Sequence, residues 1–329
     1  MILVKDLVDP INFDTFKSKY QKVPVEQICY SSEDLNHKTP QVSVMIRTFN
    51  HADYIKQAVN SVLAQKVDFE YEILLGDDES NDGTREICIE YAKRYPNKIR
   101  LFLHKRENNI KIFDKITPSF MFGYNLFNCK GKFVALLCGD DYWTDENKLQ
   151  KQWEFMRSND EYSFCYHAFQ RVLVQPDGSE NPTELLANHF FTNTVLFKNI
   201  FEYLPNAMFE TLNEDIFIYH LIKYSGKEKY IEEISPTIQR NQMKGIWFSK
   251  NDELFKTKFR ILTAQKLLEA YRNTPIKENL SGGLLYQIVK GWETLKYTGG
   301  NEVKRPNVLK FWYFLYKNEV LFKYISGQK

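Results

Sequence analysis

The sequence lacks the features that mark a secreted or membrane-spanning protein. Its five cysteines are an odd number and include no C-x-x-C pair, so we expect reduced, buried thiols and no disulfide framework. No apolar run approaches the length of a membrane span. Lys5 and Asp6 follow the first apolar residues too soon for a signal peptide. These absences predict a cytoplasmic protein.

An excess of charge of either sign is also missing. The 44 lysine and arginine residues nearly balance the 42 acidic residues, which gives no reason to expect nucleic acid as a partner. What the chain does have is 43% hydrophobic and 15% aromatic residues over a length of 329. This composition is enough for one large core or two moderate ones and predicts a folded, enzyme-sized protein.

From residue 41 the chain alternates between short apolar strands and amphipathic helices. The strands are expected at residues 42–46, 71–75, 99–103 and 132–138, and the helices at 52–65, 84–95, 118–128 and 146–157. Such alternation predicts a mostly parallel sheet with helices on both faces. In open sheets of this kind, ligands bind beyond the carboxyl ends of the strands.

The regions on either side of this pattern differ from it. Residues 1–40 form a polar leader with one short helix at 13–20, which we expect to pack on the main domain. Short strands at 162–168, 171–175 and 194–197 and a helix at 214–224 follow the alternating part, and residues 249–329 are predicted to be helical. The aromatic and basic stretch at 309–317 is typical of interfacial helices. Packing of a terminal helix onto the rest of the chain is the simpler explanation.

Asp140 and Asp141 are the sharpest local signal. Two adjacent carboxylates at the end of a strand are costly unless a cation or a donor-rich ligand is present. Mg²⁺ or Mn²⁺ would fit, because these ions take one or two protein carboxylates and fill their other positions with diphosphate oxygens and water. Capping of the helix that follows is an equally good explanation of this pair by itself.

Two further acidic clusters have ordinary local explanations as well. Asp77 and Asp78 lie in a turn rich in Asp, Asn, Ser and Gly, although a carboxylate there could also accept a hydrogen bond from a base N–H. Glu214 and Asp215 lie in a first helical turn, where acids offset the helix dipole. The functional alternative for that pair is a general base.

Taken in order, these elements resemble family 2 glycosyltransferases of the GT-A fold over residues 41–248. Residues 42–50 resemble the family's opening strand and nucleotide-contacting loop, residues 140–143 its D-x-D-type metal and ribose motif, and residues 214–215 its E-D pair. Arg240, Gly245 and Trp247 resemble a later Y-R-x-H-x-x-G-x-W motif. Its tyrosine and histidine are Gln239 and Gln242 here, and glutamine cannot supply the positive charge of a histidine.

The resemblance implies an inverting transfer of a sugar from a nucleotide diphosphate donor, with UDP favoured. The expected acceptor is a hydroxyl of a glycan or a lipid-linked glycan in surface polysaccharide synthesis, and a lipid-linked acceptor would place the enzyme on the inner face of the membrane through its C-terminal helix. Residues 41–143 would form the nucleotide-binding half and residues 144–248 the acceptor half.

The same resemblance implies a role for each motif residue. Asp215 is expected to be the catalytic base, and Asp141, helped by Asp140, to hold Mn²⁺ or Mg²⁺. The residues expected to contact the nucleotide sugar are Arg47, Thr48, Phe49, Asn50, Asp77, Asp78, Asp140, Trp143, Glu214, Arg240, Gln242 and Trp247.

Two other functions remain open at this point. A sugar-nucleotide nucleotidyltransferase would need a glycine-rich loop with a basic residue to cradle a triphosphate, and residues 47–52 contain no glycine. A non-catalytic sugar-nucleotide binding module would need no base, whereas both Asp141 and Asp215 are present. The donor sugar, the linkage and the oligomeric state are not predicted.

Overall fold

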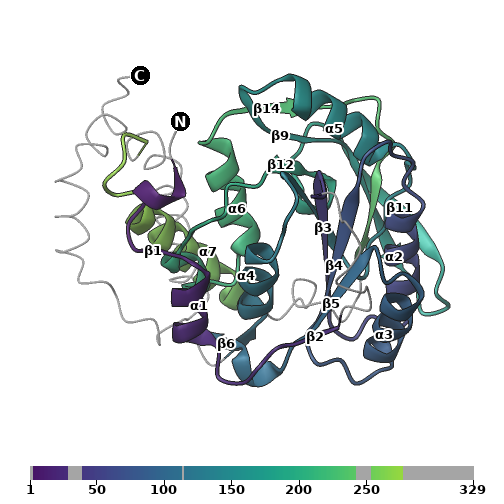
Figure 1. The fold of residues 1–329 in the computed structure, drawn as a ribbon, viewed down its shortest axis with the longest axis horizontal. Coiled ribbons are helices and arrows are strands. Elements are labelled where there is room, and N and C mark those ends of the chain that lie inside the picture. Colours follow the sequence, from purple (N-terminus) through teal and green to yellow (C-terminus); the bar gives the residue numbers. More distant parts are fainter. Residues whose placement is uncertain (1–2, 29–38, 113–114, 242–252, 277–329) are drawn as a thin grey trace.

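The computed structural model describes residues 3–28, 39–112, 115–241 and 253–276 (Figure 1). Several predicted features lie outside these residues: Cys29, Gln242, Gly245, Trp247, and everything predicted beyond residue 276.

An eight-stranded sheet forms the centre of the molecule. Its strand order is β14 (Lys227–Tyr230), β9 (Tyr162–Tyr166), β12 (Leu196–Lys198), β8 (Phe133–Cys138), β3 (Val42–Thr48), β4 (Tyr71–Asp77), β5 (Ile99–Leu103) and β2 (Glu26–Ile28). Strands β8, β3, β4 and β5 are mutually parallel, while β12 and β2 run antiparallel to their neighbours. The predicted mostly parallel sheet is therefore confirmed.

Helices cover both faces of this sheet because its central strands are apolar on both sides. Successive side chains of β3 alternate between the faces: Val44 and Ile46 pack in one core cluster, and Met45 packs in the other. The first cluster includes residues of α2 (Ile55–Leu63), α3 (Thr84–Arg94) and α5 (Lys148–Ser158), and the second includes residues of α4 (Ser119–Phe127) and α6 (Glu214–Lys223). Figure 1 shows α2 and α3 on the side of the sheet opposite to α4 and α6.

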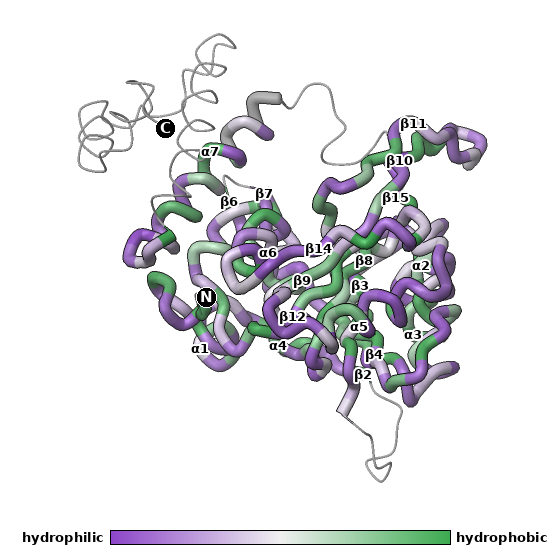
Figure 2. The backbone as a smooth tube through the Cα atoms, turned by 90° about the horizontal axis from the view of Figure 1, so that it is seen from above, coloured by the Kyte–Doolittle hydropathy of each residue, from purple (hydrophilic) through white to green (hydrophobic). Residues whose placement is uncertain are grey.

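A smaller sheet joins the main one near the end of β8. It consists of β11 (Glu180–Leu186), β10 (Phe169–Val174) and β15 (Thr237–Asn241), in that order. Figure 2 shows the β10–β11 hairpin at the margin of the molecule, whereas the hydrophobic central strands lie inside it. A single antiparallel bridge between Tyr142 and Ile238 connects this sheet to the loop that follows β8.

The N-terminal segment and the last described helix complete the core. Strand β1 (Pro10–Ile11) pairs with β13 (Leu204–Pro205), and Phe16 of α1 (Phe13–Tyr20) is fully buried against Phe120 and Phe209. Helix α7 (Glu253–Ala270) contributes Leu267 to the same core cluster. The remaining elements are a hairpin of β6 (Ile110–Ile112) and β7 (Lys115–Thr117) and four short 3-10 helices: η1 (Val4–Asp6), η2 (Arg106–Asn108), η3 (Thr192–Thr194) and η4 (Asn206–Glu210).

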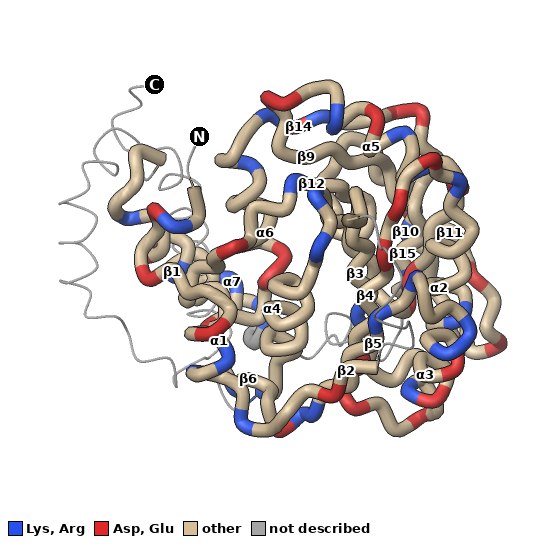
Figure 3. Tube along the Cα trace, in the orientation of Figure 1, with Lys and Arg blue, Asp and Glu red and all other residues tan. Residues whose placement is uncertain are grey.

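Three of the described cysteines, Cys88, Cys129 and Cys165, are buried as expected, whereas Cys138 is partly exposed. Cys88, Cys129, Cys138 and Cys165 are all free thiols. Figure 3 shows acidic and basic residues interspersed along the described chain. Among the described helices, none combines the length and the apolar character that a membrane span requires.

Candidate functional site

The predicted site residues gather where three parallel strands end. In the register of the sheet, Thr48 of β3 lies beside Asp77 of β4, and Arg47 lies beside Cys138 of β8. The loops that carry Phe49, Asp78 and Asp140 follow directly from these strands. The carboxyl edge of the sheet is therefore the candidate site, as the alternating pattern predicts.

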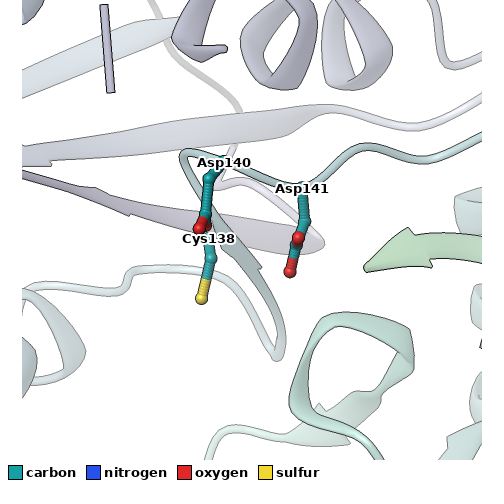
Figure 4. Close-up of side chains that lie close together, drawn as sticks. All are labelled: Cys138, Asp140 and Asp141. Carbon is teal, nitrogen blue, oxygen red and sulfur yellow. The ribbon is translucent and has the colours of Figure 1, made fainter. Parts of the chain in front are cut away.

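Three potential metal ligands follow one another at the end of β8. A sulfur or carboxylate oxygen from each of Cys138, Asp140 and Asp141 lies within 4.8 Å of the others. In Figure 4 the three side chains point to the same side of the loop. Two carboxylates are suitable donors for Mn²⁺ or Mg²⁺, so the residues present fit the expected ion. Cys138 was not among the predicted site residues.

Asp141 is the anchored member of this cluster. Its Oδ1 accepts a hydrogen bond of 2.8 Å from the backbone N–H of Arg240, and its Oδ2 accepts one from the side-chain amide of Asn193. The side chain is buried, and its pKa lies well above the usual range because of burial and the neighbouring charge of Asp140. The protein therefore fixes both carboxylate oxygens from within.

Asp140 is the more accessible member. Its side chain is 24% exposed, and its Oδ2 lies 3.8 Å from Nε2 of His51. The preceding Gly139 lets the loop pass close to β3, since a Cβ there would lie 2.6 Å from Oγ1 of Thr48. Asp140 therefore presents its carboxylate at the edge of the sheet while Asp141 faces inward.

Arg240 holds this loop in place. Its Nη1 donates a 2.7 Å hydrogen bond to the main-chain carbonyl of Asp140, and its Nε donates one of 2.6 Å to Glu180. The guanidinium lies between the rings of Tyr54 and Tyr142, at 4.9 and 4.6 Å from their centroids. Arg240 therefore has a structural role in holding the loop, and its contact with the nucleotide sugar stays a prediction.

Trp143 also belongs to the structure beneath the site. Its ring is 4% exposed, its Nε1 donates a 2.9 Å hydrogen bond to the carbonyl of Asn193, and Nζ of the buried Lys148 lies 4.0 Å from the ring centroid. Trp143 is therefore buried in this structure, and its contact with the nucleotide sugar stays a prediction. Trp143 supports Asn193, which in turn holds Asp141.

Asp77 is fully buried at the end of β4. Its Oδ2 accepts hydrogen bonds from Nε of Arg85 at 2.6 Å and from the backbone of Ser80 at 3.3 Å. Its Oδ1 is buried and has no partner among the described residues. An unpartnered buried acceptor is costly, and a ligand N–H would satisfy it.

Asp78 and Phe49 share a partner, Arg106. Asp78 accepts hydrogen bonds from Arg106 at 3.1 Å and from the amide of Asn109 at 2.8 Å, and burial raises its pKa to about 6. The Arg106 guanidinium also lies 4.1 Å from the centroid of the Phe49 ring, which is 37% exposed. Arg106 therefore supports a ring that remains accessible to a ligand.

Asn50 links the loop after β3 to the loop after β4. It has a positive φ of 55°, its backbone N–H donates to Ser80 at 2.9 Å, and its Oδ1 accepts from the backbone of Asn81 at 3.0 Å. Thr48 is buried, with its Oγ1 3.2 Å from Nδ1 of His51. These two residues fix the loop geometry around Phe49.

Glu214 and Asp215 begin helix α6 and differ in environment. Glu214 is buried and accepts a hydrogen bond from Oγ of Ser119, and burial raises its pKa to about 7. Asp215 is exposed, and its Oδ1 accepts a 2.9 Å hydrogen bond from the backbone of Ile216. The dense protein around it raises its pKa, while the positive charge of Arg47 opposes that shift.

Arg47 is the basic residue beside Cys138 in the register of β3 and β8. Its guanidinium lies 5.1 Å from the ring centroid of Phe122 and is hydrogen-bonded to the side chain of Cys138. Burial lowers its pKa, but the charges of Cys138, Glu214 and Asp215 outweigh this effect and raise it. Arg47 therefore lies beside the cluster at the end of β8, and the charges of the acids at the start of α6 act on it.

Sequence comparisons relate this site to known proteins. A family described as "Glycosyl transferase family 2" matches residues 43–217. An uncharacterized protein of Mycobacterium bovis is 30% identical over 222 residues, which cover 63% of this chain and 61% of that protein. TuaG of Bacillus subtilis, named as a teichuronic acid biosynthesis glycosyltransferase, is 34% identical over 163 residues, which cover 48% of this chain and 59% of TuaG. The matched region thus spans about 60% of the length of these relatives.

A solved structure supports the fold. Residues 1–349 of S. aureus TarS, crystallised in complex with UDP-GlcNAc, superpose with a TM-score of 0.53 and 18% identity, over 75% of this chain and 72% of TarS 1–349. The predicted GT-A fold is confirmed by this likeness and by the central sheet.

Proposed function

The chain belongs to glycosyl transferase family 2, and from this membership we propose that it is an inverting enzyme that transfers a sugar from a nucleotide diphosphate donor to an acceptor hydroxyl. One observation carries the proposal. The carboxyl edge of the sheet holds a partly exposed Asp140 beside Cys138 and Arg47, and an exposed Asp215 whose charge acts on Arg47. Family membership argues against the nucleotidyltransferase alternative, and the exposed Asp215 argues against a purely binding module.

Asp215 is the proposed general base. It would remove the proton of the acceptor hydroxyl as that oxygen attacks the anomeric carbon and the bond to the diphosphate breaks on the opposite face. This role needs a carboxylate that a substrate can reach. Asp215 is exposed, whereas Glu214 is buried beneath it and bonded to Ser119.

Asp140 is the proposed principal ligand of the divalent ion, with Asp141 anchoring the loop. This division reverses the emphasis expected from the sequence, because Asp141 is buried with both oxygens hydrogen-bonded by the protein. When bound, Mn²⁺ or Mg²⁺ would supply Lewis-acid stabilisation of the charge on the leaving nucleoside diphosphate. Arg240 and Asn193 would keep the loop in a geometry ready for the ion.

The nucleoside is proposed to lie between Phe49 and Asp77. The accessible Phe49 ring offers a stacking surface, and the unpartnered Oδ1 of Asp77 suits the imino N–H of a base such as uracil. UDP is the proposed nucleotide. The complex of TarS with UDP-GlcNAc supports this choice because that domain has the same fold.

The proposed acceptor is a hydroxyl of a glycan or a lipid-linked glycan in the synthesis of a surface polysaccharide. The names of TuaG and of GgaA, a minor teichoic acid biosynthesis protein of Bacillus subtilis, support this class. A lipid-linked acceptor would favour peripheral contact with the inner face of the membrane.

A screen of sugar nucleotides for slow metal-dependent hydrolysis tests the proposal without an acceptor. We expect Mn²⁺-dependent release of UDP from at least one UDP-sugar. Asp215→Asn should bind UDP with Mn²⁺ as the wild type does, while sugar transfer to an identified acceptor falls by roughly 10²–10⁴-fold. The exposed Asp14→Asn in α1 is the control. Near-normal transfer by the Asp215→Asn variant would remove Asp215 from the role.

A further inference from the structure

Arg47 has more hydrogen-bond donors than partners. A guanidinium carries five N–H groups, but among the described residues the only side-chain hydrogen bond of Arg47 is to Cys138. The Phe122 ring, 5.1 Å away, packs against it. An arginine held in place with most donors unused is prepared for an oxyanion, because guanidinium groups match phosphate and carboxylate geometry.

Other arginines near this edge show the contrast. Arg240 gives its donors to Glu180, Gln57 and the carbonyl of Asp140. Arg85 bonds Asp77 and the carbonyl of His104 at 2.6 and 2.7 Å. The protein consumes the donors of both. Arg106 keeps some donors, but it bonds Asp78 and lies over the Phe49 ring. Arg47 is therefore the arginine beside Cys138 that can serve a ligand.

The neighbouring acids do not occupy Arg47. Glu214 accepts its hydrogen bond from Ser119, and Asp215 accepts from its own helix. Within the described chain, neither forms an ion pair with Arg47 at 4.0 Å or less, although their charges act on it. The acids therefore keep the guanidinium charged without using its donors.

The position of Arg47 selects the ligand group. Arg47 lies beside Cys138 in the register of β3 and β8, and the sulfur of Cys138 lies within 4.8 Å of carboxylate oxygens of Asp140 and Asp141. An oxyanion that bridges this cluster and the space before Asp215 would meet the guanidinium. In the proposed reaction, that oxyanion is the phosphate that carries the sugar.

We propose that Arg47 binds the sugar-linked phosphate of the nucleotide diphosphate donor and stabilises it as the leaving group. The inference rests on the proposed function and assigns this site a fixed protein cation. When the sugar–oxygen bond breaks, its electron pair stays on the phosphate oxygen, and the guanidinium offsets the added negative charge.

Calorimetry with UMP and UDP in the presence of Mn²⁺ tests this role. The ratio of the two affinities isolates the second phosphate, because both nucleotides share the base, the ribose and the first phosphate. In Arg47→Gln we expect the gain from UMP to UDP to shrink by roughly ten- to a hundredfold, as for the loss of a charge-assisted contact. Arg47→Lys keeps a positive charge but lacks the paired N–H groups of a guanidinium. Its gain in affinity from UMP to UDP should therefore shrink several-fold less than that of Arg47→Gln.

Arg157→Gln is the matched control. Arg157 also packs on an aromatic ring, with its guanidinium 4.4 Å from the centroid of Trp153, but it lies near the end of α5 that leads into β9, away from the carboxyl edge. In Arg157→Gln, the ratio of the affinities for UDP and UMP should equal that of the wild type. If Arg47→Gln does not fold, the Arg47→Lys ratio decides the question.

Four results would overturn the inference. An unchanged ratio in a folded Arg47 variant excludes contact with the second phosphate, and equal losses for UMP and UDP indicate a purely structural role. A loss confined to UDP-glucuronate, compared with UDP and UDP-glucose, would instead indicate recognition of a sugar carboxylate. A wild-type chain that binds neither nucleotide would overturn the proposed function itself, and the Arg47 role with it.

Discussion

Asp140 and Asp141 are neighbours in the chain but face different environments. Asp141 points into the protein, where Asn193 and the backbone of Arg240 hold it, and Asp140 remains partly open to solvent. Leaving a buried carboxylate without one of its partners is costly, because the remaining charge is not compensated. The position of Asp140 therefore depends on residues that bind no substrate themselves.

Asn193→Leu tests this dependence. The change removes the amide donor to Asp141, so we expect a loss of roughly 1–3 kcal/mol of unfolding free energy and weaker Mn²⁺-dependent binding of UDP. Chemical denaturation and calorimetry measure the two effects. Asn199→Leu removes two amide hydrogen bonds of 3.0 and 2.9 Å at the opposite edge of the sheet, and it should lower stability alone. Wild-type affinity for UDP in a folded Asn193→Leu chain would contradict the proposed anchoring.

Glu214 gives a prediction about pH. Burial raises its pKa from 4.5 to about 7 in the folded chain, so the folded state retains a proton that the unfolded state loses. Between these two pH values the folded state binds more protons, and its stability falls as pH rises. The glutamine of Glu214→Gln cannot ionise, so the stability of this variant should not fall with pH for this reason.

We expect Glu214→Gln to match the wild type near pH 4 and to exceed its stability at pH 8 by about 3 kcal/mol, from one pKa shift of the stated size. Urea unfolding at several pH values checks the difference. Glu26→Gln, on the exposed strand β2, serves as the control. If the unfolding free energies of the wild type and of Glu214→Gln change with pH in the same way, Glu214 is not the source of the pH dependence.

For single residues, the sequence indicated which side chains belong to the candidate site better than it indicated what each of them does. Asp140, Asp141 and Asp215 stand out because carboxylates follow strands or begin a helix. Asn193 carries no such signal, since its partner Asp141 lies 52 positions away and only the fold brings them together. The burial of Trp143 could not be predicted either, because a tryptophan beside a motif gives no local sign of whether its ring faces a ligand or the core.

At the scale of elements, the site depends on the close approach of the loops after β3 and β8. A Cβ on Gly139 would lie 2.6 and 2.8 Å from Oγ1 and Cβ of Thr48 and 3.0 Å from Nδ1 of His51. Such distances would force one loop away from the other. The separation of these loops sets where Asp140 stands relative to Phe49.

Gly139→Ala should therefore weaken Mn²⁺-dependent UDP binding by at least about tenfold, an effect of about 1.4 kcal/mol. Gly178→Ala is the matched control: its φ of 82° makes alanine strained, but no heavy atom lies within 4 Å of the added Cβ. We expect the control to lose stability and keep its affinity for UDP. Unaltered UDP binding by Gly139→Ala would mean that the loops can separate without cost.

The elements that the sequence predicted and those it missed differ in burial. The central strands β3, β4, β5 and β8 were found because they are short apolar runs between amphipathic helices. Strands β2, β11 and β14 were missed, since they lie at sheet edges and are largely exposed. An edge strand needs no apolar face to pair, so its sequence carries little of the strand pattern.

The whole molecule uses segments outside the family match to support the site. Helix α7 lies beyond residue 217, yet Thr263 accepts a 2.9 Å hydrogen bond from Asn213, the residue before Glu214. Leu267 and Tyr271 are buried in the same core cluster as α6. The predicted division at residue 249 therefore separates segments that share one core, although the domain boundaries themselves stay a prediction.

A chain that ends at residue 248 tests this support. Each buried large apolar side chain contributes roughly 1.5–3 kcal/mol, so the loss of α7 should exceed the roughly 5–15 kcal/mol that typically stabilises a domain. We expect the shortened chain to lack a cooperative thermal transition. A chain that ends at residue 276 keeps α7 and is the comparator. A sharp transition and normal UDP binding in the 1–248 chain would show that α7 is dispensable.

The hydrogen bond between Asn213 and Thr263 also limits how this chain can be recombined with its relatives. A chimaera that grafts only residues 43–217 into another scaffold would carry Asp215 but leave behind the neighbour that braces the start of its helix. Exchange of acceptor specificity by domain shuffling should therefore transplant residues 206–223 together with 253–276 as one unit. The two segments that contact each other would then be exchanged together, and no crossover would separate Asn213 from Thr263.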